Sequence, residues 1–245
     1  MAIATLVPPA HDLLAASAAA VAELLRFAAL GAVLGLDVVS FPQAMLSRPL
    51  VSATLAGTLA GRPGAGLLLG AVLELFALET LPVGASRYPE WGSASVVGGA
   101  VYAAQPDRSA GALCLSVLVA LATAYVGGLS MVLLRRLNGQ LARAQREHLA
   151  AGSARAVVSL QLAGFGADLL RGFALTVLAL GLALPLLHAA ADRWTVDQRL
   201  SLAVVVGLAA TVAGAAVWKL FHAVPRARWL FAGGIAAGLL LVALR

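Results

Sequence analysis

Apolar residues divide this chain into an interrupted first half and a more regular second half. A helix needs about 20 apolar residues to cross a bilayer. In the second half we predict four membrane spans: Ala110–Leu134, Gln161–Leu187, Leu200–Leu220 and Trp229–Leu244. Polar stretches separate these runs, and three tryptophans lie near their ends, where interfacial aromatic residues are common.

The apolar runs of the first half are mostly shorter. Pro49–Gly61 and Ser93–Ala104 are too short to cross alone, whereas Gly64–Val83 is near full length but contains two glutamates. Short or interrupted apolar segments are typical of discontinuous and re-entrant helices beside a transporter's binding site. The proline- and glycine-rich stretch 82–93 then breaks any helix, and it predicts either irregular backbone beside a cavity or an exterior loop.

The first apolar run, Leu13–Leu36, is long enough to span a bilayer. Glu23 and Arg26 interrupt its middle. We therefore expect a tilted or amphipathic lead, followed by a short inserted piece that covers Phe27–Leu36.

Composition determines the class of protein. The chain has 245 residues, of which 61% are hydrophobic and 11% charged, and its mean hydropathy is +0.94. Soluble domains are about 45–50% apolar and about 25% charged. Apolar runs of this length form helices in lipid, because a helix satisfies its own backbone polar groups. We predict an all-α integral membrane protein, with residues 1–245 forming one domain of about six to eight inserted segments.

Basic residues concentrate at the ends of the apolar runs. The net charge is +6, and the connection 135–155 carries Arg135, Arg136, Arg143, Arg146 and Arg155 against Glu147 alone. By the positive-inside rule this connection is a cytoplasmic loop, and a second basic edge around 219–228 falls on the same side. No interleaving of aromatic and basic residues suggests nucleic-acid binding.

Glu74 is the polar residue with the strongest functional signal. A carboxylate at mid-bilayer costs about 2.5–3.5 kcal/mol on insertion scales, so such residues usually face a protein-lined cavity. Gly66 and Gly70 precede it at intervals of four, which places all three on one closely packed helix face. Glu74 then either binds a ligand or serves as a structural carboxyl, for example as a partner of Arg48 or Arg87.

The start of the second apolar run is a further candidate. Pro49 suits the first turn of a helix, and Ser47 can cap it. A helix N-terminus inside the membrane offers free N–H groups and partial positive charge to a polar ligand. Gln43 and Ser47 would then line the site; the alternative is an ordinary capped helix whose Arg48 reaches a lipid headgroup.

Other chemical signals are weak. Asp168 and Arg171 stand three apart on one predicted helix face, and they suggest a structural pair. Cys114 is expected to be a small buried hydrophobic residue. The histidines lie far apart, without the spacing of metal ligands, and no glycine-rich phosphate loop is present. The sequence therefore predicts neither a metal nor a cofactor.

Several motifs match a known family in order and spacing: Asp37, Ser47-Arg48-Pro49-Leu50-Val51, Leu55-Ala56-Gly57, Gly70-x-x-Leu73-Glu74-Leu75, Val83-Gly84-Ala85 and Pro89-Glu90. With them the chain resembles the IIC component of the mannose/fructose/sorbose class of the bacterial phosphotransferase system. The match is specific over about residues 37–100, and residues 1–20 look like an N-terminal extension. The chain departs from the family at Ser47, where many relatives have histidine, and at Glu90, where relatives have aspartate.

This resemblance implies a sugar permease subunit in the bacterial inner membrane. Its partners would be a IID membrane subunit, usually in trimers of heterodimers, and cytoplasmic IIB and IIA proteins that supply the phosphoryl group. This subunit would carry no phosphoryl-transfer residue of its own. We expect Glu74, Gln43 and Ser47 to hydrogen-bond sugar hydroxyls, Arg48 to orient them and Asp37 to support the hairpin.

Two alternatives remain open at this point. The chain could be a membrane scaffold or regulator that kept the fold without transport. It could also be a proton-coupled transporter that uses Glu74 and Glu79 as a relay, although Glu79 lies near the end of its segment and is the weaker candidate.

Overall fold

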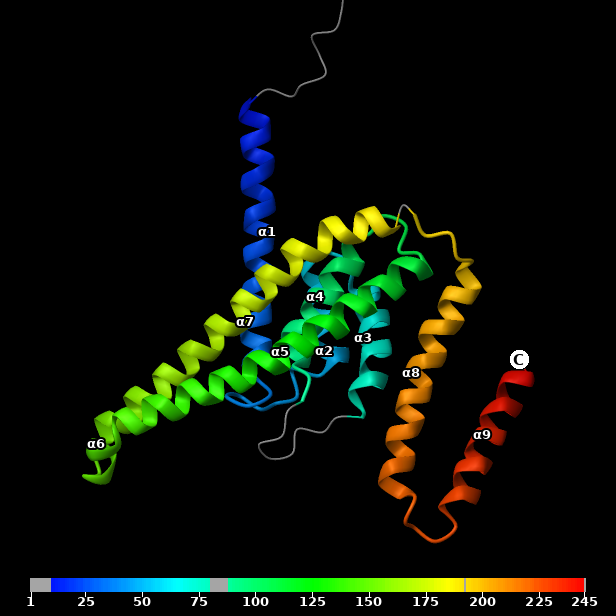
Figure 1. The fold of residues 1–245 in the computed structure, drawn as a ribbon. Coiled ribbons are helices and arrows are strands. Elements are labelled where there is room, and N and C mark those ends of the chain that lie inside the picture. Colours follow the sequence, from blue (N-terminus) through cyan, green and yellow to red (C-terminus); the bar gives the residue numbers. More distant parts are fainter. Residues whose placement is uncertain (1–9, 80–87, 192, 245) are drawn as a thin grey trace, which may run out of the picture.

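The computed structural model describes residues 10–79, 88–191 and 193–244, and all regular structure in these ranges is helical. The helices are α1 (Ala10–Leu36), α2 (Pro49–Leu59), α3 (Pro63–Ala77), α4 (Trp91–Ala104), α5 (Ala110–Ala144), α6 (Arg146–Ala150), α7 (Ala154–Ala191), α8 (Gln198–Phe221) and α9 (Ala227–Ala243). Figure 1 shows their arrangement. The protein is an all-α membrane protein, as predicted.

Four helices are long and apolar enough to cross a membrane, within the ranges Ser17–Leu36, Ala110–Ala144, Ala154–Leu187 and Gln198–Phe221. Three shorter apolar helices, α2, α3 and α9, accompany them. These helices agree with the predicted number of inserted segments and with the predicted mixture of full-length and short pieces.

The central helix of the bundle is α4. Every residue from Gly92 to Ala103 is buried, because α1, α2, α3, α5 and α7 all pack around it. Small residues make this possible, since glycine, alanine and serine allow close approach of neighbouring backbones. Pro89 and Glu90 precede α4, and the Glu90 carboxylate accepts a hydrogen bond from the Ser93 amide at 3.0 Å, which caps the helix.

Glycines bring α2 and α3 together as a tight hairpin. A Cβ atom added to Gly66 would lie 2.2 Å from the Ala53 carbonyl oxygen, and one added to Gly70 would lie 2.8 Å from the Pro49 carbonyl oxygen. The turn between the helices contains Gly61, whose φ of 70° favours glycine. The predicted small-residue face that ends in Glu74 is therefore confirmed as the α2–α3 interface.

The first segment differs from the prediction. α1 is one continuous helix of 27 residues rather than an amphipathic lead with a separate piece Phe27–Leu36. Glu23 and Arg26 do not break it, because single charged residues interrupt an apolar pattern without disturbing backbone hydrogen bonds. Both charged residues are exposed.

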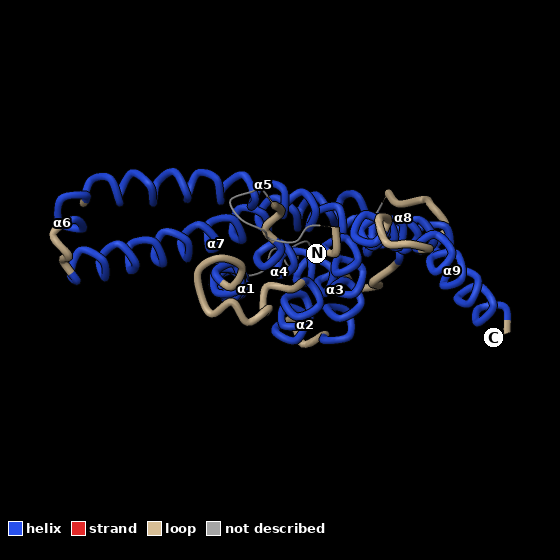
Figure 2. The backbone as a smooth tube through the Cα atoms, turned by 90° about the horizontal axis from the view of Figure 1, so that it is seen from below, coloured by secondary structure: helices blue, strands red, loops and turns tan. Residues whose placement is uncertain are grey.

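The predicted loop 135–155 is mostly helical, so the expectation of a loop was wrong. α5 continues to Ala144, α6 follows directly and α7 begins at Ala154. Leucine, arginine, glutamine and alanine dominate this stretch, and these residues favour helix even outside lipid. Figure 2 shows α5 and α7 running side by side to α6 at one end of the molecule.

The two basic edges of the chain lie on the same side of the molecule. Figure 1 shows α6 and the α8–α9 connection at the bottom, whereas α1 begins at the top. The hairpin base, where α2 starts and α3 ends, also faces the lower side, and the α2–α3 turn faces the upper side. We refer to these as the basic side and the opposite side.

The last helices lie at the edge of the bundle. α8 packs on α3 and α5 through Val205 and Ala209, and its start is fixed by Trp194, whose indole N–H donates to the Ser201 hydroxyl at 3.0 Å. In α9 only Ala227 is buried, and its leucines are exposed. An apolar helix with so little internal contact faces lipid or another chain.

Candidate functional site

The hairpin base begins with Arg48, which occupies the N-cap position of α2. Ser47 does not cap the helix as the sequence suggested, because its hydroxyl donates to the Asp37 carboxylate at 2.9 Å instead. Pro49 stands at the first helical position, where its missing N–H is harmless. The polar side chains before α2 therefore turn in two directions, Arg48 toward α3 and Ser47 toward the end of α1.

Arg48 and Glu74 form an ion pair across the hairpin base. The Arg48 Nε atom donates to Glu74 Oε1 at 2.7 Å, and Nη2 donates to the same oxygen. The other carboxylate oxygen accepts from the Leu50 amide at 3.2 Å. The carboxylate of Glu74, a residue of α3, thus lies against the start of α2. A helix offers unpaired N–H groups and partial positive charge at this end.

This ion pair keeps capacity for a ligand. The Arg48 and Glu74 side chains are 28% and 23% exposed, so each reaches the surface of the described bundle. A carboxylate accepts about four hydrogen bonds and a guanidinium donates five. Acceptor and donor capacity therefore remains after the contacts within the chain, in a form that suits neighbouring hydroxyl groups.

Asp37 anchors the loop that leads into the hairpin. Asp37 directly follows α1. Its carboxylate accepts hydrogen bonds from the Ala44 amide at 2.7 Å, from the Ser47 amide at 2.8 Å and from the Ser47 hydroxyl. Burial raises the pKa of Asp37, but the hydrogen bonds from Ser47 and Ala44 outweigh it and hold the pKa below its ordinary value. The ionised carboxylate therefore ties α1 to the start of α2.

Two other candidates lie apart from the ion pair. Gln43 is exposed, and its amide donates to the Val39 carbonyl at 2.9 Å within its own loop. Glu79 is also exposed and lies beyond the end of α3. The predicted span Gly64–Val83 is thus shorter in the structure, and the helix-breaking stretch 82–86 and Arg87 lie outside the described residues.

A second polar cluster lies inside the bundle, and the sequence revealed it only in part. The predicted pair is confirmed: Arg171 Nε donates to Asp168 Oδ1 at 2.9 Å. Glu90 completes the cluster from the start of α4, with Oε2 3.8 Å from Arg171 Nη1. All three side chains are at least 92% buried, so two carboxylates share one guanidinium inside the bundle.

Hydrogen bonds connect this cluster to the surrounding helices. The Ser40 hydroxyl donates to Asp168 at 2.5 Å, and Arg171 Nη1 donates to the Ser130 hydroxyl of α5 at 3.2 Å. The role of Glu90 does not follow from local spacing, because 81 positions separate it from Arg171. The only signal was its place in the Pro89-Glu90 motif.

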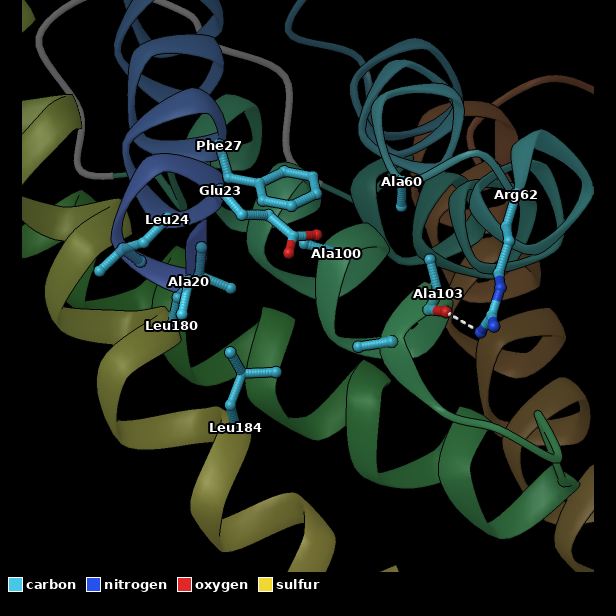
Figure 3. Close-up of a pocket in the computed structure, with 11 residues that line it drawn as sticks. Ala20, Glu23, Leu24, Phe27, Ala60, Arg62, Ala100, Ala103, Leu180 and Leu184 are labelled. Carbon is cyan, nitrogen blue, oxygen red and sulfur yellow. Dashed lines mark hydrogen bonds between the residues drawn. The ribbon is translucent and has the colours of Figure 1, made fainter. Parts of the chain in front are cut away.

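Three cavities of different size lie near the hairpin and near the α5–α7 pair. One of about 50 Å³ lies between Arg48, Tyr88 and Trp91, and it is much smaller than the roughly 300–1,000 Å³ of small-molecule sites. A cavity of about 380 Å³ lies between Ser40, α5 and α7 on the basic side. Another of about 410 Å³ lies at the α2–α3 turn, on the opposite side (Figure 3).

Tyr88 connects an arginine of the basic side with the cavity beside the hairpin base. The Arg135 guanidinium lies 5.2 Å from the centre of the Tyr88 ring, which is a cation–π contact. Tyr88 in turn borders the small cavity beside Arg48. Among the described residues, no group of three or more histidine, cysteine, aspartate or glutamate side chains is arranged to hold a metal ion.

Residues 19–217 match the family model of the sorbose-specific IIC component of the phosphotransferase system. The chain belongs to this family. It is therefore a sugar-specific IIC membrane component, and membership implies that it works with other components of such a system. The shared motifs quoted above, from Asp37 to Glu90, all fall inside the matched range.

A solved structure titled "Structure of membrane protein" has the same fold. It superposes with a TM-score of 0.71 over 91% of this chain and 90% of that chain, at 17% sequence identity. At this identity the similarity concerns the fold alone. A comparison with curated proteins found no match.

Proposed function

We propose that this IIC component moves a hexose across the bacterial inner membrane together with a IID subunit, while cytoplasmic IIB and IIA proteins deliver the phosphoryl group. The observation that carries the proposal is the α2–α3 hairpin. Its helices have 11 and 15 residues, or about 16 and 22 Å, which is less than the roughly 30 Å of the hydrocarbon core. Such helices end at membrane depth, where polar groups are found beside a transport path.

The ion pair at the hairpin base is the proposed sugar contact. Glu74 accepts hydrogen bonds from neighbouring sugar hydroxyls, and Arg48 donates to a hydroxyl or ring oxygen. We assign Asp37 and Ser47 to holding the loop before α2, since they bind each other, and Gln43 to the exposed rim of that loop. The charges of Arg48 and Glu74 cancel, which fits an uncharged substrate.

Orientation and assembly complete the proposal. The positive-inside rule puts the basic side in the cytoplasm, so the hairpin base faces the phosphoryl-donating proteins. The exposed apolar surfaces of α8 and α9 face lipid, the IID subunit or neighbouring copies in a trimeric assembly.

Sugar uptake tests this function. The chain is expressed with IID, IIB and IIA proteins from its own genome in cells that lack a hexose permease. We expect these cells to take up at least one hexose, and this uptake should depend on phosphoenolpyruvate. Glu74→Gln should slow it about 10- to 100-fold, because a hydrogen bond to a charged group contributes about 1.5–3 kcal/mol. Glu79→Gln is the matched control and should leave uptake unchanged.

Each alternative gives a distinct result. Wild-type uptake by Glu74→Gln would refute the assigned sugar contact. Absence of uptake for every hexose, with all partners present, would favour a scaffold or regulator. Uptake that persists without phosphoenolpyruvate but stops when the proton gradient is dissipated would favour a proton-coupled transporter.

A further inference from the structure

The cavity at the α2–α3 turn has no role in the proposed sugar contact at the hairpin base. Its volume is about 410 Å³, within the range of small-molecule sites. The walls come from four places: the middle of α1, the end of α4, the second half of α7 and the turn itself. Figure 3 shows the lining side chains, several of which are alanines that leave the space open.

Two opposite charges face this cavity. Arg62 lies on the turn, and its guanidinium donates to the Ala103 carbonyl and, at 2.9 Å, to the Gln105 carbonyl, which fixes it against the end of α4. Glu23 enters from α1 (Figure 3) and makes no hydrogen bond with any other described residue. The cavity thus has a positioned donor group, an acceptor without a partner and no net charge.

The remaining walls are apolar, and two of their side chains are buried. Phe27 lies next to Glu23 and is 6% exposed, and Leu180 of α7 is 1% exposed. A preformed cavity with apolar walls and a few polar groups is the usual form of a small-molecule site. The C–H faces of a sugar ring pack on such walls, while its hydroxyls reach the donor and the acceptor.

The cavity and the ion pair mark the two ends of one hairpin. α2 begins after Arg48 and ends two residues before Gly61, next to Arg62, so about 16 Å of helix separates the ends. That length is about half of the hydrocarbon core. The hairpin base is on the basic side and the cavity on the opposite side, as Figure 1 shows for the two ends of α2 and α3.

We propose that this cavity is a second carbohydrate subsite, which takes an uncharged polyhydroxylated ligand from the side opposite the basic residues. Glu23 accepts from its hydroxyls, and Arg62 donates to its oxygens. The inference rests on the proposed transport of a sugar and adds an external site to the one at the hairpin base. Glu23, which only interrupted an apolar pattern in the sequence, then has a role in ligand binding.

Direct binding tests the subsite. The full chain is purified with its IID subunit in nanodiscs, and radiolabelled D-mannose, D-fructose and L-sorbose are the probes. Glu23→Gln removes the charge with little change in shape, and Ala20→Phe fills the cavity from an exposed position on α1. Both variants should raise the Kd of the bound sugar about tenfold or more. Arg26→Gln is the matched control on the same helix and should bind as wild type.

Uptake measurements separate this proposal from the proposed function. Glu23→Gln should raise the external sugar concentration needed for half-maximal uptake, whereas Glu74→Gln slows uptake at every concentration. If Glu23→Gln and Ala20→Phe bind and take up sugar as wild type while Glu74→Gln is impaired, the second subsite is refuted and the transport function stands. If the wild-type protein binds none of the three probes and takes up no hexose, both proposals fail. Size-exclusion chromatography verifies that each variant is folded.

Discussion

Gly66 provides a direct test of the hairpin packing, through the substitution Gly66→Ala. The added Cβ atom would lie 2.2 Å from the Ala53 carbonyl oxygen and 2.9 Å from the Gly57 Cα atom. Both neighbours are backbone atoms, so no side-chain rotation relieves the contact. Carbon–oxygen contacts between packed helices are about 3.3–3.6 Å. α3 must therefore move away from α2 by about 1 Å.

The expected energy follows from two opposing effects. Overpacking of this kind costs about 1–3 kcal/mol. Alanine in a helix interior is more favourable than glycine by about 0.5–1 kcal/mol. The net result is destabilisation by up to about 2.5 kcal/mol. The displacement also separates Arg48 from Glu74, because these residues belong to the two helices that move apart.

The assay compares Gly66→Ala with Gly64→Ala in the same helix. An added Cβ atom at Gly64 meets no atom within 4 Å, so this control has the same chemistry without the clash. We expect Gly66→Ala to lower the apparent melting temperature in detergent and to slow sugar uptake, while Gly64→Ala does neither. Equal melting temperatures and uptake rates for the two variants would refute the hairpin packing.

Two further substitutions test the buried polar groups. Asp37→Asn should loosen the loop before α2 and increase its proteolysis at neutral pH. Because the folded pKa of Asp37 lies below its unfolded value of 3.8, its contribution to stability is present above that value and is lost as the pH falls through the folded pKa. The loss of thermal stability as the pH falls below 3.8 should therefore weaken in Asp37→Asn. An unchanged pH profile of melting would contradict the role of this carboxylate. Arg171→Leu should destabilise the protein by about 3–5 kcal/mol, since it leaves two buried carboxylates without a cation. Adding Glu90→Gln and Asp168→Asn should restore folded protein in detergent extracts, and no recovery would contradict the shared-charge arrangement.

The sequence was sufficient for the features that depend on local pattern. Run length and composition predicted the helical membrane fold, and the spacing of Gly66, Gly70 and Glu74 predicted a packed helix face. The pair formed by Asp168 and Arg171 followed from their separation of three. Each of these inferences needs only the geometry of one helix.

Features that depend on several helices were not predictable in this way. Glu90 reaches Arg171 because α4 and α7 pack together, and no spacing rule connects residues so far apart. Ser47 was expected to cap α2, but Asp37 competes successfully for its hydroxyl once the loop folds back on α1. In the same way, Glu23 and Arg62 come together at one cavity only through the packing of α1 beside the hairpin turn.

Two segments are more helical than their sequence suggested. Charged residues in Leu13–Leu36 and in 135–155 suggested breaks, whereas the backbone continues as helix through the first and through most of the second. Charged residues such as arginine and glutamate have helix propensities close to that of leucine, so they do not by themselves interrupt a helix.

The length of α5 has a mechanical consequence. Its 35 residues extend about 52 Å, well beyond the roughly 30 Å of hydrocarbon, and contain no proline. Gly127 and Gly128 in its middle touch Glu90 and Tyr88, while its last turns carry arginines toward α6. One continuous helix therefore connects α6 with Glu90 and Tyr88. We expect a protein that binds at α6 to act on the surroundings of the hairpin base through this helix, and the glycine pair in its middle is the place where it can bend.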